Sequence, residues 1–500
     1  MALIVVLVRL ALQLAFGART AESVASSVSG SLSLAGWILL FGIINVSVDF
    51  KKLLSRAPRV FNSVVTPLSI ALSLVPAIAV ISTRVRTAVQ LRSKLTGFRL
   101  VRSIAVPVVS SAVEQAMNLA DSIQSRTSRK NPVSEVNLKL KEFAYPGKRP
   151  ILAQNNLKAM PGTVTLIHGK TGSGKSTLLK LIQANTPGTA FVGQAPRETF
   201  LSDTVFDELA FAPRQLGKSD VEVNAIVNRF ASKFMLNPKA DPLELSAGWQ
   251  QRVAIAAALT CGSKVLLLDE PLSALDQAGT NRLLETLTQL KNSGHTVLIA
   301  EHRTSALIPV ADVFLKLENG KLIPSKPSQE SLPQNAPKSG TIRVLMGQNG
   351  SGKTTFLNRL AKSRGVLVPQ PASDLLYLDD VAAELDQADR EAKVASGSAR
   401  SIFESFVEGF DDSQNPRDLS EGQKLALAIS IQLTKNTDFL MLDEPTLGFD
   451  FDARRTLANH LIRLANSGVE VLVATHDRDF AAAIGTESVE ISEVVGFAKQ

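Results

Sequence analysis

The chain has 500 residues, of which 45% are hydrophobic and 20% charged, enough for about two to four domains. Its single cysteine, Cys261, excludes an intramolecular disulfide and suits a reducing compartment. The formal charge of +8 is concentrated in residues 1–130, where 15 Lys and Arg stand against 4 Asp and Glu beside apolar runs. This placement favours a membrane topology over nucleic-acid binding, with scattered solvated charge as the alternative.

The N-terminal quarter contains apolar runs that resemble membrane spans in length. Residues 2–16 and 33–48 are mostly apolar, and residues 64–82 contain 19 positions without a charge, close to the roughly 20 that cross a bilayer. Basic clusters flank the third run on both sides, and both favour the inner face, so the topology stays open. We expect a helical membrane module at residues 1–131.

An amphipathic helix follows at residues 112–124. Val113 and Met117 lie on its apolar face and Asp121 on the opposite face, and Pro132 comes after its basic end. Such a helix packs against a protein core or against a membrane surface.

Two α/β modules occupy the rest of the chain. Alternating strand-like sequence starts near Val136, and the first module is expected at 132–323. A polar, proline-rich segment at 324–340 has no core-forming pattern and is predicted to be a linker. The second module is expected at 341–500.

Each module contains a glycine-rich loop between a strand pattern and a helix pattern. The loops are GKTGSGKST at 169–177 and GQNGSGKTT at 347–355. Glycines let backbone N–H groups approach phosphate oxygens at a helix N-terminus, the lysine reaches the β- and γ-phosphates, and the next hydroxyl binds Mg²⁺. A chance glycine turn is the alternative, and the repetition argues against it. The predicted ATP-binding residues of the loops are Gly169, Gly172, Gly174, Lys175, Ser176 and Thr177, and Gly347, Gly350, Gly352, Lys353, Thr354 and Thr355.

An apolar strand in each module ends in an Asp-Glu pair. The pairs are Asp269-Glu270 and Asp443-Glu444. Beside a P-loop, the aspartate holds Mg²⁺ through water and the glutamate polarises the attacking water as general base. We therefore expect Mg²⁺ to be held by Ser176 with Asp269 and by Thr354 with Asp443.

Equal spacings show that the two modules are duplicates. His302 and His476 each follow the Glu of the pair by 32 positions, and Ser246 and Ser420 each precede it by 24. A single histidine after a strand is usually structural, but a repeated spacing indicates an internal duplication.

Together these motifs resemble the ATP-binding cassette of ABC transporters over essentially all of 136–490. The resemblance implies ATP and Mg²⁺ as cofactors and ATP hydrolysis as the activity. It implies that Glu270, His302, Glu444 and His476 are catalytic. It implies further ATP contacts from Tyr145, Gln194, Gln370, Ser246, Gly248, Ser420 and Gly422.

In that family two cassettes close head to tail, and the P-loop of each faces the Leu-Ser-x-Gly signature of the other. Two departures stand out. Trp249 replaces the usual glutamine of the first signature, and the second cassette leaves no room for opening strands or an adenine-stacking aromatic. We expect the site of Glu270, completed by Ser420, to carry most of the turnover.

The N-terminal residues resemble the later part of the transmembrane coupling (T) component of energy-coupling-factor (ECF) importers. Its second small-Arg-small motif is matched by the segment from Ala120 to Thr127, and its first is matched less closely by Gln90-Leu91-Arg92-Ser93. The resemblance implies that Arg126 and Arg92 couple membrane partners to the cassettes, by pairing with acids in a groove. Basic residues that face lipid headgroups are the alternative.

The fold class expected is an α-helical membrane module followed by two α/β P-loop NTPase domains of ABC type. The implied function is ATP hydrolysis that powers uptake of a vitamin or a cobalt or nickel ion across the cytoplasmic membrane, with the ATPase domains facing the cytoplasm. Implied partners are a substrate-binding membrane subunit (S component), a further T component and membrane lipid, without nucleic acid. A soluble two-cassette ATPase that acts on ribosomes or DNA is the alternative.

Overall fold

The computed structural model describes residues 62–93, 97–127, 133–145, 150–327, 332, 337–407, 409–435 and 437–492. The chain divides into two compact units, Met1–Leu72 and Ser73–Gln500, and each is taken by itself. The apolar runs at 2–16 and 33–48 lie outside the described residues. Apart from the start of one helix, everything below belongs to Ser73–Gln500.

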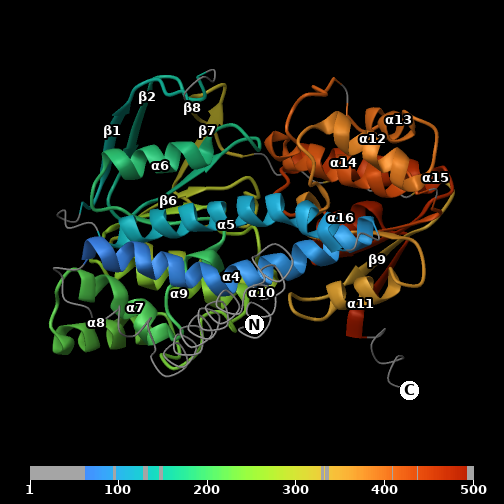
Figure 1. Cartoon of the computed structure of the whole chain (residues 1–500). Coiled ribbons are helices and arrows are strands. Elements are labelled where there is room, and N and C mark those ends of the chain that lie inside the picture. The colour runs from blue at the N-terminus through green and yellow to red at the C-terminus, as the bar shows by residue number, and fades with distance from the viewer. Residues whose placement is uncertain are drawn as a thin grey trace, which may run out of the picture. The chain divides into compact units, whose positions relative to one another are not determined.

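Two long helices, α4 (Asn62–Arg92) and α5 (Gly97–Thr127), precede the strands (Figure 1). The second half of α4 buries Val85 and Val89 completely against other protein residues. Within the described ranges, no helix is both long and apolar enough to span a membrane. The predicted helical membrane module at 1–131 is therefore wrong for the part of the chain described, and so is the placement of the chain in the cytoplasmic membrane. Apolar composition alone misled the prediction, because a helix face that packs on protein is as apolar as one that meets lipid.

The first α/β module contains a six-stranded sheet in the order β4-β5-β6-β3-β7-β8. All neighbouring strands are parallel except β7 and β8, and a separate antiparallel pair is formed by β1 and β2. The strands are β1 (Val136–Leu140), β2 (Asn155–Ala159), β3 (Val164–His168), β4 (Ala190–Val192), β5 (Val265–Asp269), β6 (Thr296–Ala300), β7 (Val313–Glu318) and β8 (Lys321–Pro324). The helices are α6 (Lys175–Asn185), α7 (Val205–Gln215), α8 (Asp220–Lys233), α9 (Ala247–Leu259) and α10 (Gln277–Asn292), with a 3-10 turn, η2 (Pro196–Thr199).

The second module repeats this plan with a five-stranded parallel sheet in the order β10-β11-β12-β9-β13. Its strands are β9 (Ile342–Met346), β10 (Val366–Val368), β11 (Phe439–Asp443), β12 (Glu470–Thr475) and β13 (Glu487–Glu490). Its helices are α11 (Lys353–Leu360), α12 (Val381–Ala392), α13 (Ser398–Glu404), α14 (Glu421–Leu433), α15 (Phe451–Asn466) and α16 (Arg478–Ile484), with 3-10 turns η3 (Ala372–Leu375) and η4 (Pro416–Asp418). Both α/β domains of the predicted fold class are therefore present, while the exact domain boundaries stay predictions.

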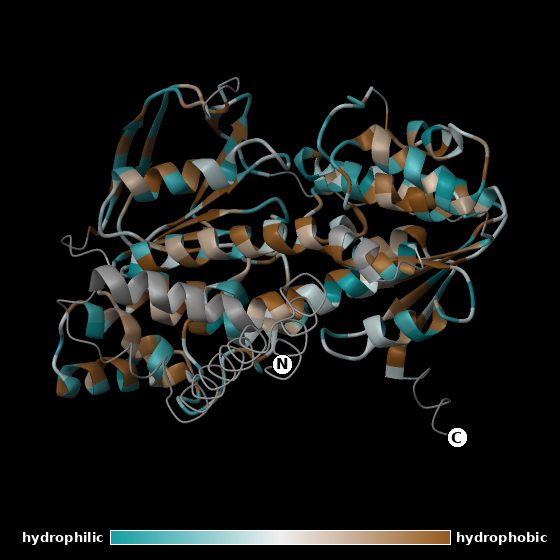
Figure 2. Cartoon of the chain, in the orientation of Figure 1, coloured by the Kyte–Doolittle hydropathy of each residue, from teal (hydrophilic) through white to brown (hydrophobic). Residues whose placement is uncertain are grey.

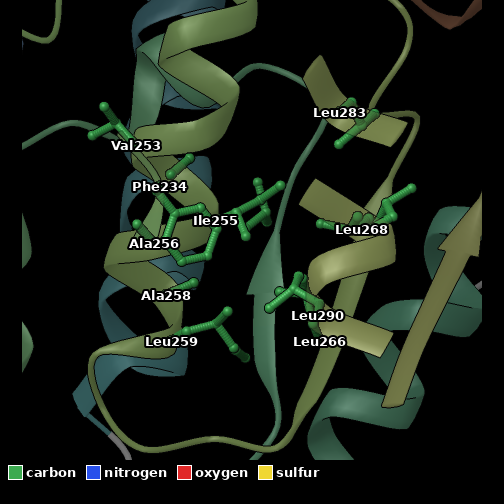
Figure 3. Packing of buried hydrophobic residues seen from close by; sticks show 14 of the residues in the cluster. Phe234, Val253, Ile255, Ala256, Ala258, Leu259, Leu266, Leu268, Leu283 and Leu290 are labelled. Atoms are coloured by element: carbon green, nitrogen blue, oxygen red, sulfur yellow. The ribbon is translucent and has the colours of Figure 1, made fainter. Parts of the chain in front are cut away.

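Burial of hydrophobic side chains stabilises both sheets. The central strands are continuous apolar runs because helices cover both faces of a parallel sheet. Figure 2 shows brown, apolar residues along the strands of both modules. Figure 3 shows part of this core, in which Ile255 of α9 and Leu266 and Leu268 of β5 are fully buried members of one hydrophobic cluster. Because parallel strands end at one edge, this core brings the P-loop, the Asp-Glu pair and the histidine of each module to a common edge.

Candidate active site

Each P-loop leads from a buried strand into a helix that begins at the P-loop lysine. The glycines just before these helices, Gly174 and Gly352, have left-handed backbone with φ of 97° and 98°. Glycine adopts this conformation without strain, so the chain can turn tightly at the helix N-terminus, where phosphate binds. The Nζ atoms of Lys175 and Lys353 each donate to two carbonyl oxygens of their own loop, at 2.7–3.1 Å.

The glutamate of each Asp-Glu pair stands in a strained turn. Glu270 and Glu444 have φ of 44° and 46°, which is uncommon for a residue with a side chain. Their backbone N–H groups donate to Ala300 and Ala474 on the neighbouring strand, both at 2.8 Å. The turn carries each carboxylate beyond the end of its strand, and the neighbouring strand holds the turn in place.

In the first cassette, Glu270 is contacted by two of the predicted site residues. Gln194 donates to one carboxylate oxygen at 3.0 Å, and Nδ1 of His302 lies 3.4 Å from the other. A third acid, the fully buried Glu301, lies 3.3 Å from the same Nδ1 and accepts the backbone N–H of His302 at 2.8 Å. Glu301 was not among the residues predicted from the sequence. The signal that could have found it is the change to Thr475 at the same place in the second cassette.

In the second cassette, Glu444 is bound from two sides. Nζ of Lys353 lies 3.2 Å from one oxygen, and Nδ1 of His476 lies 2.9 Å from the other. Burial by itself would raise the pKa of Glu444, but the hydrogen bond from His476 and the charge of Lys353 outweigh burial and lower the pKa. The carboxylate is therefore a weaker base than an ordinary glutamate.

The predicted hydroxyl–carboxylate pairs fit Mg²⁺. Ser176 donates to Asp269 at 3.0 Å, and Thr354 is hydrogen-bonded to Asp443, whose Oδ1 is buried without a partner. Burial raises the pKa of Asp269 to about 6 and also raises the pKa of Asp443. A buried carboxylate with a spare oxygen favours a nearby hard cation, which would complete its shell with phosphate oxygens and water.

The other predicted ATP contacts lie close to the P-loops. The hydroxyl of Tyr145 is 3.3 Å from Thr177 Oγ1, and its ring packs edge-on against Phe143 with the centroids 5.2 Å apart. Because Tyr145 is 42% exposed, the ring has a free surface for a base. In the second cassette, Thr355 in the first turn of α11 and Gln370 after β10 are both exposed.

The two signature helices begin at equivalent serines that are capped differently. Ser420 accepts the N–H of Gln423, and the Gln423 side chain accepts the N–H of Ser420, which makes a capping box. Ser246 has no side-chain cap bond. Trp249 stands at the place of Gln423, and its ring centre lies 5.3 and 5.4 Å from the guanidinium carbons of Arg252 and Arg282.

Cavities join each P-loop to the other cassette. One of about 550 Å³ is lined by Ser176 and Asp269 together with Glu421 of the second signature helix. Another of about 340 Å³ is lined by Gly347 of the second P-loop together with Asp276 of the first cassette. Parts of both cassettes therefore face each cavity.

The signature glycines offer a direct test of packing. A Cβ on Gly248 would lie 2.7 Å from the Cα of Gly279 on α10, whereas a Cβ on Gly422 would meet only a ring atom of Phe449 at 4.0 Å. We expect Gly248→Ala to lower the free energy of unfolding by about 1–3 kcal/mol, because α9 and α10 must separate. Gly422→Ala should leave it nearly unchanged. Urea unfolding of both variants checks this, and equal losses would contradict it.

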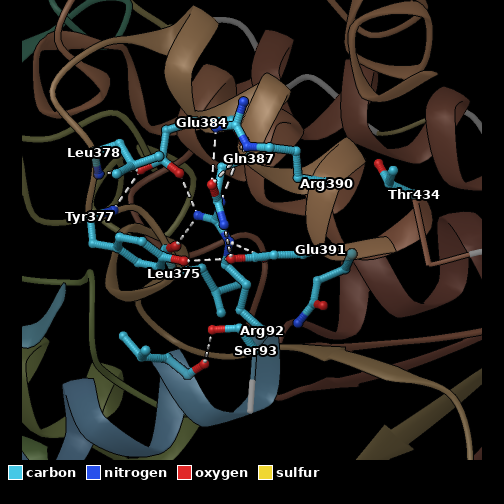
Figure 4. Close-up of polar contacts among 12 residues, drawn as sticks. Arg92, Ser93, Leu375, Tyr377, Leu378, Glu384, Gln387, Arg390, Glu391 and Thr434 are labelled. Carbon is cyan, nitrogen blue, oxygen red and sulfur yellow. Dashed lines mark hydrogen bonds and ion pairs between the residues drawn. The ribbon is translucent and has the colours of Figure 1, made fainter. Parts of the chain in front are cut away.

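Each long N-terminal helix ends with an arginine in a buried ion pair. Arg126 at the end of α5 pairs with Glu208 of α7, and Arg92 at the end of α4 pairs with Glu384 of α12. Both arginines are 2% exposed. Figure 4 shows Arg92 bound also by Glu391, at 3.2 Å, with its guanidinium carbon 4.4 Å from the centre of the Tyr377 ring.

The two acceptor glutamates occupy equivalent places. Glu208 and Glu384 are each the fourth residue of their helix, and each accepts two backbone N–H groups of the preceding segment at 2.6–3.0 Å. Neither glutamate was predicted from the sequence. A shared Glu-Leu dipeptide, four positions after the capping residues Thr204 and Asp380, is the signal that could have found them.

The duplicated sheet, the P-loops and the Asp-Glu pairs define a P-loop ATPase with two cassettes. A family model described as ABC transporter matches residues 152–273, and one described as AAA domain, putative AbiEii toxin, Type IV TA system matches residues 359–481. Neither model reaches residues 1–131, and the comparisons give no support to the predicted T component there.

Curated relatives are also described as ATP-binding proteins of ABC transporters. A putative ABC transporter ATP-binding protein of Streptomyces avermitilis is 30% identical over 65% of this chain and 86% of its own length. The nickel import ATP-binding protein NikO of Rhodobacter capsulatus is 35% identical over 42% of this chain and 95% of its own length. The energy-coupling factor transporter ATP-binding protein EcfA2 of Methanospirillum hungatei is 31% identical over 47% of this chain and 64% of its own length. A ribosome-bound archaeal Pelota and ABCE1 model is similar at 19% identity over 67% of this chain and 74% of that one, with a TM-score of 0.48.

The chain belongs to the family of ABC transporter ATP-binding proteins. It is an ATPase that binds ATP and uses Mg²⁺. It is also homologous, at moderate identity, to the ATP-binding subunit of an ECF transporter.

Proposed function

We propose that this ATPase powers ECF-type uptake of a small nutrient, a vitamin or a cobalt or nickel ion, through a separate substrate-binding membrane subunit. The names of two relatives, one an energy-coupling factor ATPase and one a nickel importer, support this assignment. The observation that carries the proposal is the pair of buried arginines at the ends of α4 and α5, one seated in each cassette.

The two arginine sites form a mechanical link. A guanidinium that is buried and bound to a carboxylate on a helix must move when that helix moves, because releasing it would leave an unpaired buried charge. Closure of the cassettes on ATP would therefore change the separation of Glu208 and Glu384. The ends of α4 and α5 would follow. In this proposal, Arg126 and Arg92 convert cassette closure into a movement of the two helices.

A stripe on α5 provides a surface for the partner. Val106, Val109, Val113 and Met117 follow one another at helical spacing and are 43–61% exposed. Large apolar side chains gathered on one face of a helix mark a protein interaction surface. We propose that this stripe contacts the substrate-binding subunit.

The proposed site assignments follow the contacts described above. Glu270 and Glu444 act as general bases, and His302 and His476 position them. ATP is held by the P-loop residues, by Tyr145, Gln194 and Gln370, and by the signature residues. The signature of each cassette serves the P-loop of the other, in keeping with the cavity that Ser176 shares with Glu421 of the second signature helix.

Purification of the tagged full chain in detergent tests the proposal. We expect a small membrane protein with a bound nutrient to co-purify, and expect Val109→Glu with Val113→Glu to lower its recovery at least about tenfold by placing two charges in an apolar contact. Val221→Glu, at an 80% exposed valine of α8, is the matched control and should have no effect. Recovery of ribosomal subunits or DNA in place of a membrane protein would overturn the assignment and favour the alternative.

A further inference from the structure

We propose that the second cassette binds a small, uncharged aromatic molecule of indole size in a pocket beside its signature helix. The pocket encloses about 320 Å³ between α14, α15 and the segment that follows α13. This volume lies at the lower end of the range for small-molecule sites. The proposal does not rest on the uptake assignment, and its pocket shares Ser420 and Gly422 with the second signature.

The first cassette shows what fills the same place in the duplicate. From the signature helix to the following helix, α9 and α10 correspond to α14 and α15 with a constant offset of 174 residues. Three large side chains of the first cassette are replaced by smaller ones that line the pocket. The replacements are Trp249 to Gln423, Arg252 to Ala426 and Arg282 to Thr456.

In the first cassette, the indole of Trp249 is built into the fold. The guanidinium carbons of Arg252 and Arg282 lie 5.3 and 5.4 Å from its ring centre, and Arg252 is fixed by an ion pair with Glu285 at 2.8 Å. The ring also packs against the main hydrophobic core of that cassette.

In the second cassette, the residues at these three positions leave the place unfilled, while Phe449 and His460 of the same lining are larger than their counterparts Leu275 and Thr286. Gln423 is turned back into the capping box with Ser420, and Ala426 and Thr456 are too short to reach across. What is left is a pocket lined by the residues that correspond to Trp249, Arg252 and Arg282.

The lining selects an uncharged aromatic ligand. None of the described lining residues is an Asp, Glu, Lys or Arg, and aromatic rings form its walls. Phe406 lies 4.7 Å from His460, ring centre to ring centre, and Phe449 is also part of the wall. Rings that line a pocket favour another ring at offset-stacked or edge-on geometry.

His460 is neutral in this wall. Arg463, which can only donate, lies 2.5 Å from Nδ1 of His460, so that Nδ1 must accept. Burial and the charge of Arg463 lower the pKa of His460 to about 4. A charged ligand would therefore find no counter-charge among the described lining residues, and the cost of desolvating it would oppose binding.

Indole itself is the probe, titrated into the full-length protein and followed by saturation-transfer NMR. We expect saturable binding with a dissociation constant on the order of 1 mM or tighter, as suits a fragment of this size. Thr456→Trp should abolish the signal, because the new ring occupies the pocket. Asn459→Trp adds the same ring at an exposed position of the same helix, outside the pocket lining, and should keep the signal.

Before indole binding is compared, circular dichroism is used to check that both variants are folded. Absence of saturable binding to the unmodified protein would overturn the proposal. Equal binding to the two variants, or equal loss in both, would overturn it as well, because neither result places indole in this pocket.

Discussion

Glu270→Gln is expected to lower the ATPase rate of the full chain by about 10²–10⁴-fold, the loss that follows removal of a general base. The amide keeps the size of the side chain and can still accept from Gln194, so the geometry of the strained turn should survive. Only the ability to take a proton from the attacking water is lost. A steady-state phosphate-release assay at saturating Mg²⁺-ATP measures the effect.

Glu444→Gln is the matched substitution in the second cassette and is expected to cost far less. The pKa of Glu444 is lowered by His476 and Lys353, so this carboxylate is a poorer base than an ordinary glutamate. The signature that would serve this site carries Trp249 in place of the usual glutamine. Equal losses from the two variants would show that both sites turn over equally and would refute the asymmetry.

Arg126→Met is expected to lower the free energy of unfolding by about 3–5 kcal/mol, because it leaves the completely buried Glu208 carboxylate without its cation. The two backbone N–H groups that Glu208 also accepts, from Leu201 and Ser202, place the loss toward the lower end. Urea unfolding, together with the rate at which protease cuts α5, measures the change.

An exposed pair supplies the control for this experiment. Lys218 and Glu222 lie 2.9 Å apart with both side chains about half exposed, so Lys218→Met should cost less than about 1 kcal/mol. Adding Glu208→Gln to Arg126→Met should restore part of the stability, since the buried charge is then removed. A double variant as unstable as the sum of its two single variants would contradict a direct interaction.

Local sequence was sufficient to predict the two P-loops and the helices that follow them. Strand, loop and helix patterns around Lys175 and Lys353 are contiguous, and each turn needs glycine at a fixed position, as the left-handed Gly174 and Gly352 show. The equal spacings of the acids and histidines make the duplication visible in the amino-acid sequence alone. The partners across the fold were not visible there, because Glu208 and Glu384 are 82 and 292 positions from their arginines.

The membrane prediction failed for a physical reason. Within the charge-free run at 64–82, Ile81 is buried against protein while Ile78 and Val80 are 39% and 65% exposed, and the buried Val85 and Val89 follow further along α4. Hydropathy measures the transfer of a side chain out of water and does not distinguish a lipid destination from a protein one. Only the contacts of the folded chain separate the two.

The sequence by itself indicated that this protein has two α/β modules with P-loops and that the two modules are duplicates, and it predicted which residues hold phosphate and Mg²⁺. The tertiary structure decided that Arg92 and Arg126 are buried in ion pairs and that Glu444 is engaged by Lys353 and His476. It also decided that a hollow remains beside α14. The residues of a motif are close together in the sequence, so the motif can be recognised there. Burial, the pKa of a carboxylate and the shape of a pocket depend on segments that meet only when the chain folds.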